Sequence, residues 1–180
     1  MNDTYIDSES DAVVNSCLLI VDVQNGFLNQ RTDHIVPRIE SLLEEPFFEY
    51  VIFTRFINSQ NSSYVKLMGW NKMFLDEETE ISRSLQPFAK SIYEKSTYTA
   101  LTEELNQFLI RCNIKTVFIC GIDIDCCVLA TAVGLFEVGI RPYVLTYYSA
   151  SNGGENSQRA AITVLERLIG KCHIIDYKLR

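Results

Sequence analysis

The sequence predicts an α/β fold: a three-layer, Rossmann-like sandwich in which helices cover both faces of a six-stranded, mainly parallel sheet. Two observations predict this class. Strand-like apolar runs alternate along the chain with helix-like segments, and the runs are apolar throughout rather than at every second residue. Continuously apolar strands are typical of parallel sheets, because both faces of such a sheet are buried. Alternating strands and helices favour right-handed βαβ crossovers.

The expected strands are short apolar runs that end in polar or glycine-containing loops, and they cover residues 17–23, 50–55, 91–95, 115–120, 141–147 and 172–177. Four segments between them are expected to be helices because they carry an apolar stripe or stop at a glycine: residues 35–43, 99–112, 125–138 and 156–169. The stretch 58–83 has no regular pattern. We expect it to be a lid, a pocket wall or a subunit contact.

Length and composition indicate one globular domain. The chain has 180 residues, of which 47% are hydrophobic and 22% are charged, as in ordinary globular proteins. Residues 1–16 are polar and acidic and are expected to form a lead-in to a single domain at 17–180. This lead-in is unlike a signal peptide, and no apolar run is long enough to span a membrane, so a cytoplasmic location is expected.

Charge and residue counts exclude several classes of function. With 23 acidic and 16 basic side chains the net charge is −7, which argues against nucleic-acid and membrane partners. The six cysteines include no CxxC pair and are expected to be reduced thiols. Only two histidines are present, so a zinc site or a histidine-based triad is not expected. We expect neither a metal nor a cofactor.

Three reactive side chains stand where expected strands end: Asp22, Lys95 and Cys127. Ligands of open parallel sheets bind at this carboxyl edge. A thiol at the start of a helix and beside an ammonium is expected to have a lowered pKa, and an aspartate can carry its proton. Backbone N–H groups around Cys127 can hold an oxyanion. The trio therefore predicts acyl transfer to water through a thioester.

Three sequence blocks resemble the isochorismatase-like cysteine hydrolase superfamily, which includes nicotinamidases, N-carbamoylsarcosine amidohydrolases and isochorismatases. The first block is LLIVDVQNGFL at 18–28 and the second is YEKSTYTAL at 93–101. The third is VFICGIDIDCCVLATAVGLFEVGI at 117–140. Three blocks in the family's order, spread over most of the chain, make a specific signal.

The resemblance implies roles for particular residues. It places Asp22, Lys95 and Cys127 at the catalytic positions, and it implies a cis peptide bond within residues 121–123, so that Ile122, Asp123 and Cys127 shape the oxyanion hole. Adjacent helical side chains point about 100° apart, so Cys126 is expected to be packed or partly exposed rather than to face the substrate. Family members often assemble, so a homo-oligomer is expected.

The chain also departs from its relatives. Nicotinamidases carry an Asp-x-His metal motif after the second strand, whereas residues 54–64 here read TRFINSQNSSY without a histidine. Metal-dependent nicotinamidase activity is therefore disfavoured. Isochorismatases of the vinyl-ether type lack the cysteine that this chain retains. Asp123 and Asp125 stand at the start of the nucleophile helix, where each can cap the helix or contact substrate, and we favour the cap for Asp125.

Several side chains near the strand ends are candidates for the walls of a substrate pocket: Gln24, Phe27, Arg55, Phe56, Asn58, Trp70 and Tyr98. For Gln24 the alternative is simple turn chemistry. For Trp70, the only tryptophan, a packed lid or subunit contact is the alternative to ligand stacking.

The sequence thus predicts a cysteine hydrolase that cleaves a C–N bond of a small amide-type molecule. The main alternative is a non-catalytic binding or interaction module on the same fold, because fold does not dictate function. A redox protein that uses the Cys126–Cys127 pair ranks last, because a disulfide between adjacent cysteines is strained. The particular substrate is not determined by the sequence.

Overall fold

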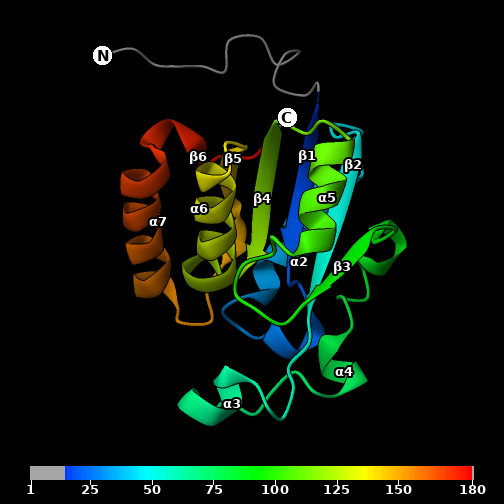
Figure 1. Cartoon of the computed structure of the whole chain (residues 1–180), viewed down its shortest axis with the longest axis vertical. Coiled ribbons are helices and arrows are strands. Elements are labelled where there is room, and N and C mark those ends of the chain that lie inside the picture. The colour runs from blue at the N-terminus through cyan, green and yellow to red at the C-terminus, as the bar shows by residue number, and fades with distance from the viewer. Residues whose placement is uncertain (1–14, 180) are drawn as a thin grey trace.

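In the computed structural model, which describes residues 15–179, a single six-stranded sheet has every strand pair parallel (Figure 1). The strand order is β3-β2-β1-β4-β5-β6. The strands are β1 (Ser16–Val21), β2 (Tyr50–Phe56), β3 (Ile92–Lys95), β4 (Thr116–Ile122), β5 (Arg141–Ala150) and β6 (Ile174–Ile175). The predicted fold class is confirmed. The expected lead-in lies outside the described residues up to residue 14, and its last residue, Ser16, already belongs to β1.

Helices connect the strands. They are α2 (Val36–Leu43), α3 (Ser63–Met68), α4 (Asp76–Thr79), α5 (Glu103–Arg111), α6 (Leu129–Glu137) and α7 (Glu155–Ile169). Short 3₁₀ turns lie at η1 (Asn25–Phe27), η2 (Asp33–Ile35), η3 (Gln86–Phe88) and η5 (Lys171–His173), and a π-helical turn, η4 (Ile124–Val128), precedes α6. Among the described residues, no helix is long and apolar enough to cross a membrane.

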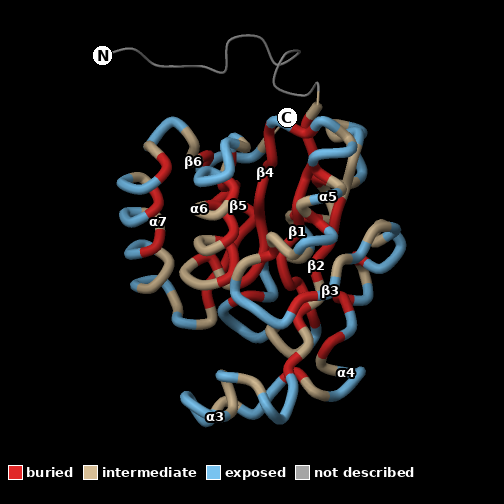
Figure 2. Tube along the Cα trace, viewed as in Figure 1, coloured by how far each residue is buried: buried red, intermediate tan, exposed pale blue. Residues whose placement is uncertain are grey.

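The sheet separates two apolar cores. Figure 1 shows α5, α6 and α7 on one face and α2 on the other. Side chains alternate between the faces along each strand. In β1, Leu19 and Val21 therefore pack in the core under α5–α7, while Leu18 and Ile20 pack in the core under α2. Figure 2 shows the central strands buried between these layers. Burial on both faces explains the continuous apolar runs in the sequence.

Some expected boundaries were wrong for local reasons. The helix expected from residue 99 begins at Glu103, because the Thr102 hydroxyl accepts a hydrogen bond from the Leu105 N–H and caps the helix there. The strand expected at 172–177 is reduced to Ile174–Ile175, because residues 171–173 form the turn η5. The stretch 58–83, which showed no pattern, contains α3 and α4.

Gly121 allows β1 and β4 to approach closely beside the site described below. Its φ is +124°, and a Cβ at this position would lie 2.1 Å from the backbone oxygen of Val21. We expect Gly121→Ala to lower the free energy of unfolding by about 3 kcal/mol more than a control glycine substitution, because backbone cannot move aside. The measurement is chemical denaturation followed by circular dichroism.

Gly139→Ala is the matched control. Gly139 also has a positive φ, +79°, but a Cβ there would have no atom within 4 Å. The control therefore reports only backbone strain, of about 1–2 kcal/mol. Equal losses for the two variants would contradict the close-approach explanation.

Candidate active site

The expected reactive residues meet at the carboxyl edge of the sheet, beside the point where the strand order reverses. The chain moves outward from β1 through β2 to β3, and then returns to place β4 on the other side of β1. Crevices at such a reversal are the usual ligand sites of open α/β sheets. Asp22 follows β1, Lys95 ends β3, and Cys127 lies in η4 after β4.

Asp22, Lys95 and Cys127 form one contiguous group. The Lys95 Nζ lies 2.6 Å from Asp22 Oδ2 and 3.5 Å from Cys127 Sγ. The ion pair is almost fully buried, with the Lys95 and Asp22 side chains 1% and 0% exposed. The structure therefore brings the three predicted catalytic residues together, from elements more than thirty residues apart in sequence.

The Asp22 carboxylate is held in a fixed orientation. Its backbone is left-handed (φ +52°) at the end of β1. The Thr54 hydroxyl of the neighbouring strand donates to Asp22 Oδ1 at 2.6 Å and accepts from the Asp22 N–H at 3.1 Å. Oδ2 faces the Lys95 ammonium and accepts no well-aligned hydrogen bond from the described residues. The Lys95 ammonium is therefore the one ion-pair partner of this oxygen among the described residues.

The Lys95 ammonium is kept charged by its surroundings. Burial by itself would lower the pKa of Lys95, but the negative charges of Asp22 and of a Cys127 thiolate, with their hydrogen bonds, raise that pKa above its ordinary value. Two backbone carbonyls, those of Thr97 and Tyr98, also accept hydrogen bonds from Nζ at 2.8 and 3.3 Å. The ring of Phe56 lies 5.1 Å from the ammonium.

The Cys127 thiol corrects one expectation. Burial raises its pKa well above the ordinary value, the Asp22 carboxylate raises it further, and Lys95 only partly offsets these effects. The expected lowering of the thiol pKa by a helix start and a lysine is therefore wrong for the resting site. The cause is the neighbouring anion together with the loss of water around the sulfur.

The segment before Cys127 has an unusual backbone. The Ile122–Asp123 peptide bond is cis, within the segment for which the resemblance implied such a bond. Asp123 occupies the N-cap position of η4, yet no side chain caps this turn. The Asp123 Oδ1 instead accepts hydrogen bonds from the Asn152 backbone N–H at 2.7 Å and from its Nδ2 at 2.9 Å. The expectation that Asp125 caps the nucleophile helix was therefore wrong.

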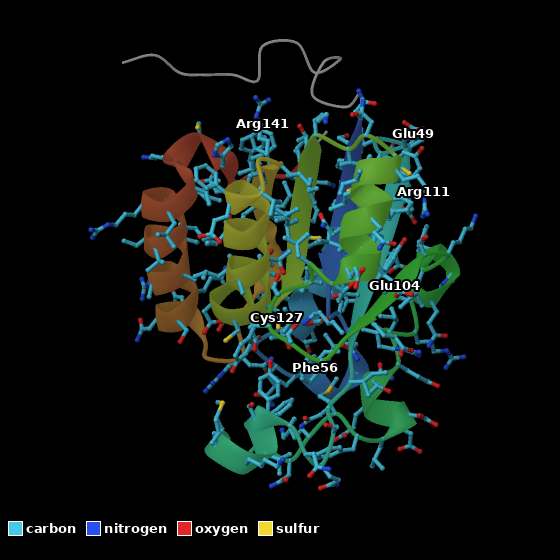
Figure 3. The ribbon with its side chains drawn as sticks, viewed as in Figure 1. Glu49, Phe56, Glu104, Arg111, Cys127 and Arg141 are labelled. Carbon is cyan, nitrogen blue, oxygen red and sulfur yellow. The ribbon has the colours of Figure 1, made fainter. Side chains whose placement is uncertain are left out.

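A pocket of about 250 Å³ opens over the thiol. Five of its lining residues are aromatic, and the lining consists of Gly26, Phe27, Phe56, Tyr64, Met68, Trp70, Lys72, Tyr98, Asp123, Cys126, Cys127 and Asn152. Figure 3 shows Cys127 and Phe56 at the end of the sheet that faces the α3 segment, and Arg141 at the opposite end. The Phe27 and Trp70 rings are parallel within 7°, with centroids 6.2 Å apart. Such a pocket suits a small molecule with a flat apolar body.

Three of the predicted wall residues do not line this pocket. Gln24 is buried, and its side-chain amide bonds to the backbone of Phe56 and Thr79. Arg55 pairs with Glu94 on the neighbouring strand. Because side chains alternate along a strand, Phe56 reaches the pocket and Arg55 does not.

Asn58 is the third corrected residue. Its side chain donates to the backbone oxygen of Lys72 at 3.0 Å and accepts from the Ser62 hydroxyl at 2.6 Å. It therefore fixes the α3 segment, and it is not among the residues that line this pocket. The predicted residues Phe27, Phe56, Trp70 and Tyr98 do line the pocket.

Six lining residues were not predicted from the sequence as substrate-pocket residues: Tyr64, Met68, Lys72, Gly26, Cys126 and Asn152. The first three lie in the stretch 58–83, where no sequence pattern indicated which side chains face the pocket. Cys126 was expected to face away from the substrate, but the pocket extends around the start of η4 and reaches both adjacent thiols. Its partial exposure agrees with the expectation.

One cluster of potential metal ligands lies beside this pocket. Ligating atoms of Asp123, Asp125 and Cys126 lie within 4.8 Å of one another, and no other such group of three or more occurs in residues 15–179. Acidic clusters are common without an ion.

The fold and the site define the class of this protein: a doubly wound α/β protein with an aspartate, a lysine and a cysteine grouped at the switch point of its sheet. The family model described as "Isochorismatase domain" matches residues 16–173, so the chain belongs to the isochorismatase family.

Similar solved structures share this fold. An isochorismatase-like hydrolase from Alkaliphilus metalliredigens has a TM-score of 0.77 at 16% identity, over 89% of this chain and 93% of the other. A nicotinamidase from Bacillus subtilis gives 0.74 at 20%, over 90% and 99%. An N-carbamoylsarcosine amidase from Thermoplasma acidophilum gives 0.74 at 20%, over 89% and 94%. A search of curated proteins gave no match.

Replacing Thr54 tests whether its hydroxyl holds the Asp22 carboxylate. We expect Thr54→Val to lower the free energy of unfolding by about 1–3 kcal/mol, because the buried Asp22 N–H and Oδ1 both lose their partner. The matched control is Thr146→Val, which removes one buried hydrogen bond, at 3.2 Å to the Ile175 carbonyl, away from the site. Urea denaturation measures both, and a loss no larger than the control's would contradict this role of Thr54.

Proposed function

We propose that this chain is a cysteine hydrolase that cleaves a C–N, amide-type bond of a small molecule through a thioester intermediate. The observation that carries the proposal is the buried Lys95–Asp22 ion pair in contact with the Cys127 sulfur, which itself lines a pocket. Removing a charge pair from water costs free energy, so such a pair is weak evidence for a stabilising role. A catalytic role explains why it lies beneath a nucleophile. Membership of the isochorismatase family and the similarity to amidases support this reaction class.

The resting site holds a neutral thiol beside an ion pair. The raised pKa of Cys127 keeps the proton on sulfur, and the raised pKa of Lys95 keeps the ammonium charged. Asp22 is then the base. As Sγ attacks the carbonyl carbon of the amide, Asp22 Oδ2 takes the thiol proton and the C=O electron pair moves onto oxygen. Lys95, in contact with both Asp22 and Sγ, stabilises the partial thiolate charge on sulfur as its proton leaves, before that charge passes to the carbonyl oxygen.

Collapse of the tetrahedral intermediate breaks the C–N bond. Backbone N–H groups at Asp123 and Cys127 hold the oxyanion, and the protonated Asp22 gives its proton to the leaving nitrogen. The products are an amine, or ammonia, and a thioester on Cys127. Water then attacks the thioester, Asp22 takes a proton from that water, and the proton returns to sulfur as the carboxylic acid leaves.

The walls of the pocket indicate the shape of the substrate. Phe27 and Trp70 present nearly parallel rings, and Tyr64 and Tyr98 pack edge to face with centroids 5.1 Å apart. These rings favour a flat, apolar body next to the scissile carbonyl. With a volume of about 250 Å³, the pocket suits a molecule of one or two rings rather than a peptide.

Hydrolysis itself is the first test. We expect ammonia release from a panel of small aromatic and aliphatic primary amides, nicotinamide among them, to be lost in Cys127→Ser, Asp22→Asn and Lys95→Met, by about 10³-fold or more in each. The losses should not add in double variants, because the three groups act as a unit. Cys172→Ser is the matched control, since Cys172 is an exposed thiol outside the pocket. A wild-type protein that binds these amides without cleaving them would favour the binding module.

The protonation state of the thiol gives a second test. Asp22 raises the pKa of Cys127 and Lys95 lowers it. Removing the carboxylate charge in Asp22→Asn should therefore lower the pKa of the thiol. We expect the pH at which iodoacetamide alkylates Cys127 to shift downward in Asp22→Asn, measured by mass spectrometry with exposed Cys172 as the internal reference. An unchanged or upward-shifted profile would show that Asp22 does not act on the sulfur.

A further inference from the structure

Asp123 presents a carboxyl group to the pocket that the proposed reaction does not use. It follows β4 directly, it lines the pocket together with Cys126 and Cys127, and it is only partly exposed. One of its oxygens and the Cys126 Sγ lie within 4.8 Å of each other. In the proposed reaction only the backbone of Asp123 takes part, at the oxyanion hole. The role of its side chain is therefore a separate question.

The two oxygens of this carboxyl group differ in their partners. Oδ1 accepts both hydrogen bonds from Asn152, at 2.7 Å from the backbone N–H and 2.9 Å from Nδ2. Among residues 15–179 no donor is hydrogen-bonded to Oδ2, and this oxygen is not among the fully buried atoms that lack a partner. It is therefore an accessible acceptor on a residue of the pocket wall.

Asn152 holds this carboxyl group in place. Its carbonyl accepts from Arg31 at 2.9 Å, its Nδ2 also donates to the Phe27 carbonyl at 3.2 Å, and its Oδ1 accepts from Asn29. The loop after β1 and the loop after β5 are thus joined through Asn152. An acceptor fixed in this way is pre-organised for a ligand group, because little freedom is lost on binding.

Charged groups of both signs lie around Asp123. Asp125 follows it on η4, and Asp22 acts on it from the end of β1. Lys95 is already paired with Asp22, Arg31 contacts Asn152, and Lys72 is an exposed member of the pocket lining. The pKa of Asp123 is raised to about 6: burial raises it most, Asp125 and Asp22 raise it further, and the Asn152 hydrogen bonds partly lower it. Near neutral pH the group is therefore mainly a carboxylate without an ion-pair partner among the described residues.

We infer that Asp123 is a specificity-determining residue whose side chain accepts a hydrogen bond from an N–H or ammonium group of the substrate. This inference rests on the proposed function in that the substrate is taken to be attacked by Cys127. The site then selects neutral or cationic amides that carry a donor, and it rejects molecules with a carboxylate near the reacting carbon. Rejection follows because a second anion beside the reacting carbon would be repelled by the Asp123 carboxylate, which has no ion-pair partner among residues 15–179.

Paired alkylating probes test this selectivity without requiring hydrolysis. Iodoacetamide and iodoacetate deliver the same reactive carbon to Cys127, one with an amide donor and the other with a negative charge. The measured quantity is the ratio of their Cys127 alkylation rates, determined by mass spectrometry near neutral pH and divided by the same ratio for exposed Cys172. Because both probes react with the same thiolate, a change in the pKa of Cys127 cancels in this ratio.

Asp123→Asn is the informative variant. The Asn oxygen can still accept both hydrogen bonds from Asn152, so the structural role is kept, while the free acceptor becomes an NH₂ donor. We expect this variant to reduce the preference for iodoacetamide by about fivefold or more. In the wild type the preference should also fall as the pH drops through about 6, where Asp123 gains a proton. In Asp123→Asn this pH dependence should be absent.

Asp125→Asn is the matched control, because it removes the same charge from the adjacent turn but Asp125 does not line the pocket. We expect it to change the preference by less than about twofold. A shift in Asp125→Asn equal to that in Asp123→Asn, or no shift in Asp123→Asn, would overturn the inference. Thermal unfolding of each variant checks that it folds. If Asp123→Asn does not fold, Asp123→Ala is the second variant that removes the acceptor oxygen.

The outcome is independent of the hydrolase test. If the wild type cleaves amides but Asp123→Asn keeps the full preference, the proposed function stands and the role of Asp123 fails. If no amide is cleaved but the preference depends on Asp123, the pocket still selects donors and the hydrolase proposal fails.

Discussion

The site depends on one buried ion pair. Lys95 and Asp22 lie 2.6 Å apart with almost no exposure to water, so neither charge is stable without the other. The pKa of Cys127 is raised first by burial, and the pair acts on it in both directions: the carboxylate raises it further and the ammonium lowers it. In the proposed reaction the carboxylate is the proton acceptor and the ammonium is the counter-ion of the attacking sulfur. The surrounding hydrogen bonds, from Thr54 to Asp22 and from Lys95 to two carbonyls, serve to keep this pair in one geometry.

The topology of the sheet explains how the pair can form. β1 and β4 are neighbours, β3 lies two strands away, and all three end at the same edge. In a parallel sheet each crossover carries the chain back to the edge where strands begin, so every strand ends at the same opposite edge. Residues at strand ends can therefore meet without any local sequence pattern that indicates their contact. The close approach at Gly121 brings the end of β4 against Val21, directly before Asp22. The three candidate catalytic residues lie at or after the ends of strands, whereas the pocket walls come from several segments, among them η1, the end of β2 and the α3 segment.

The sequence predicted these two parts of the site unequally. Asp22, Lys95 and Cys127 could be found because each follows an apolar run whose end is visible in the sequence, and because three blocks resemble one family. The pocket walls were only partly predictable. Phe27, Phe56, Trp70 and Tyr98 line the pocket, but Gln24, Arg55 and Asn58 make structural contacts instead. The direction in which each of these side chains points depends on the alternation along its strand and on backbone partners up to 55 residues away. A local sequence pattern does not indicate such partners.

The sequence by itself determined the fold class and the approximate strands, and it singled out the three candidate catalytic side chains, since apolar runs and short motifs are local properties of the chain. Only the tertiary structure decided that burial and Asp22 raise the pKa of the Cys127 thiol, that Cys126 lines the pocket with Cys127, and that Asp123 bonds to Asn152 instead of capping a helix. Each of these depends on how much water is removed from a group and which distant charges replace it. Both the loss of water and the nearby charges come from residues that become neighbours only when the chain folds.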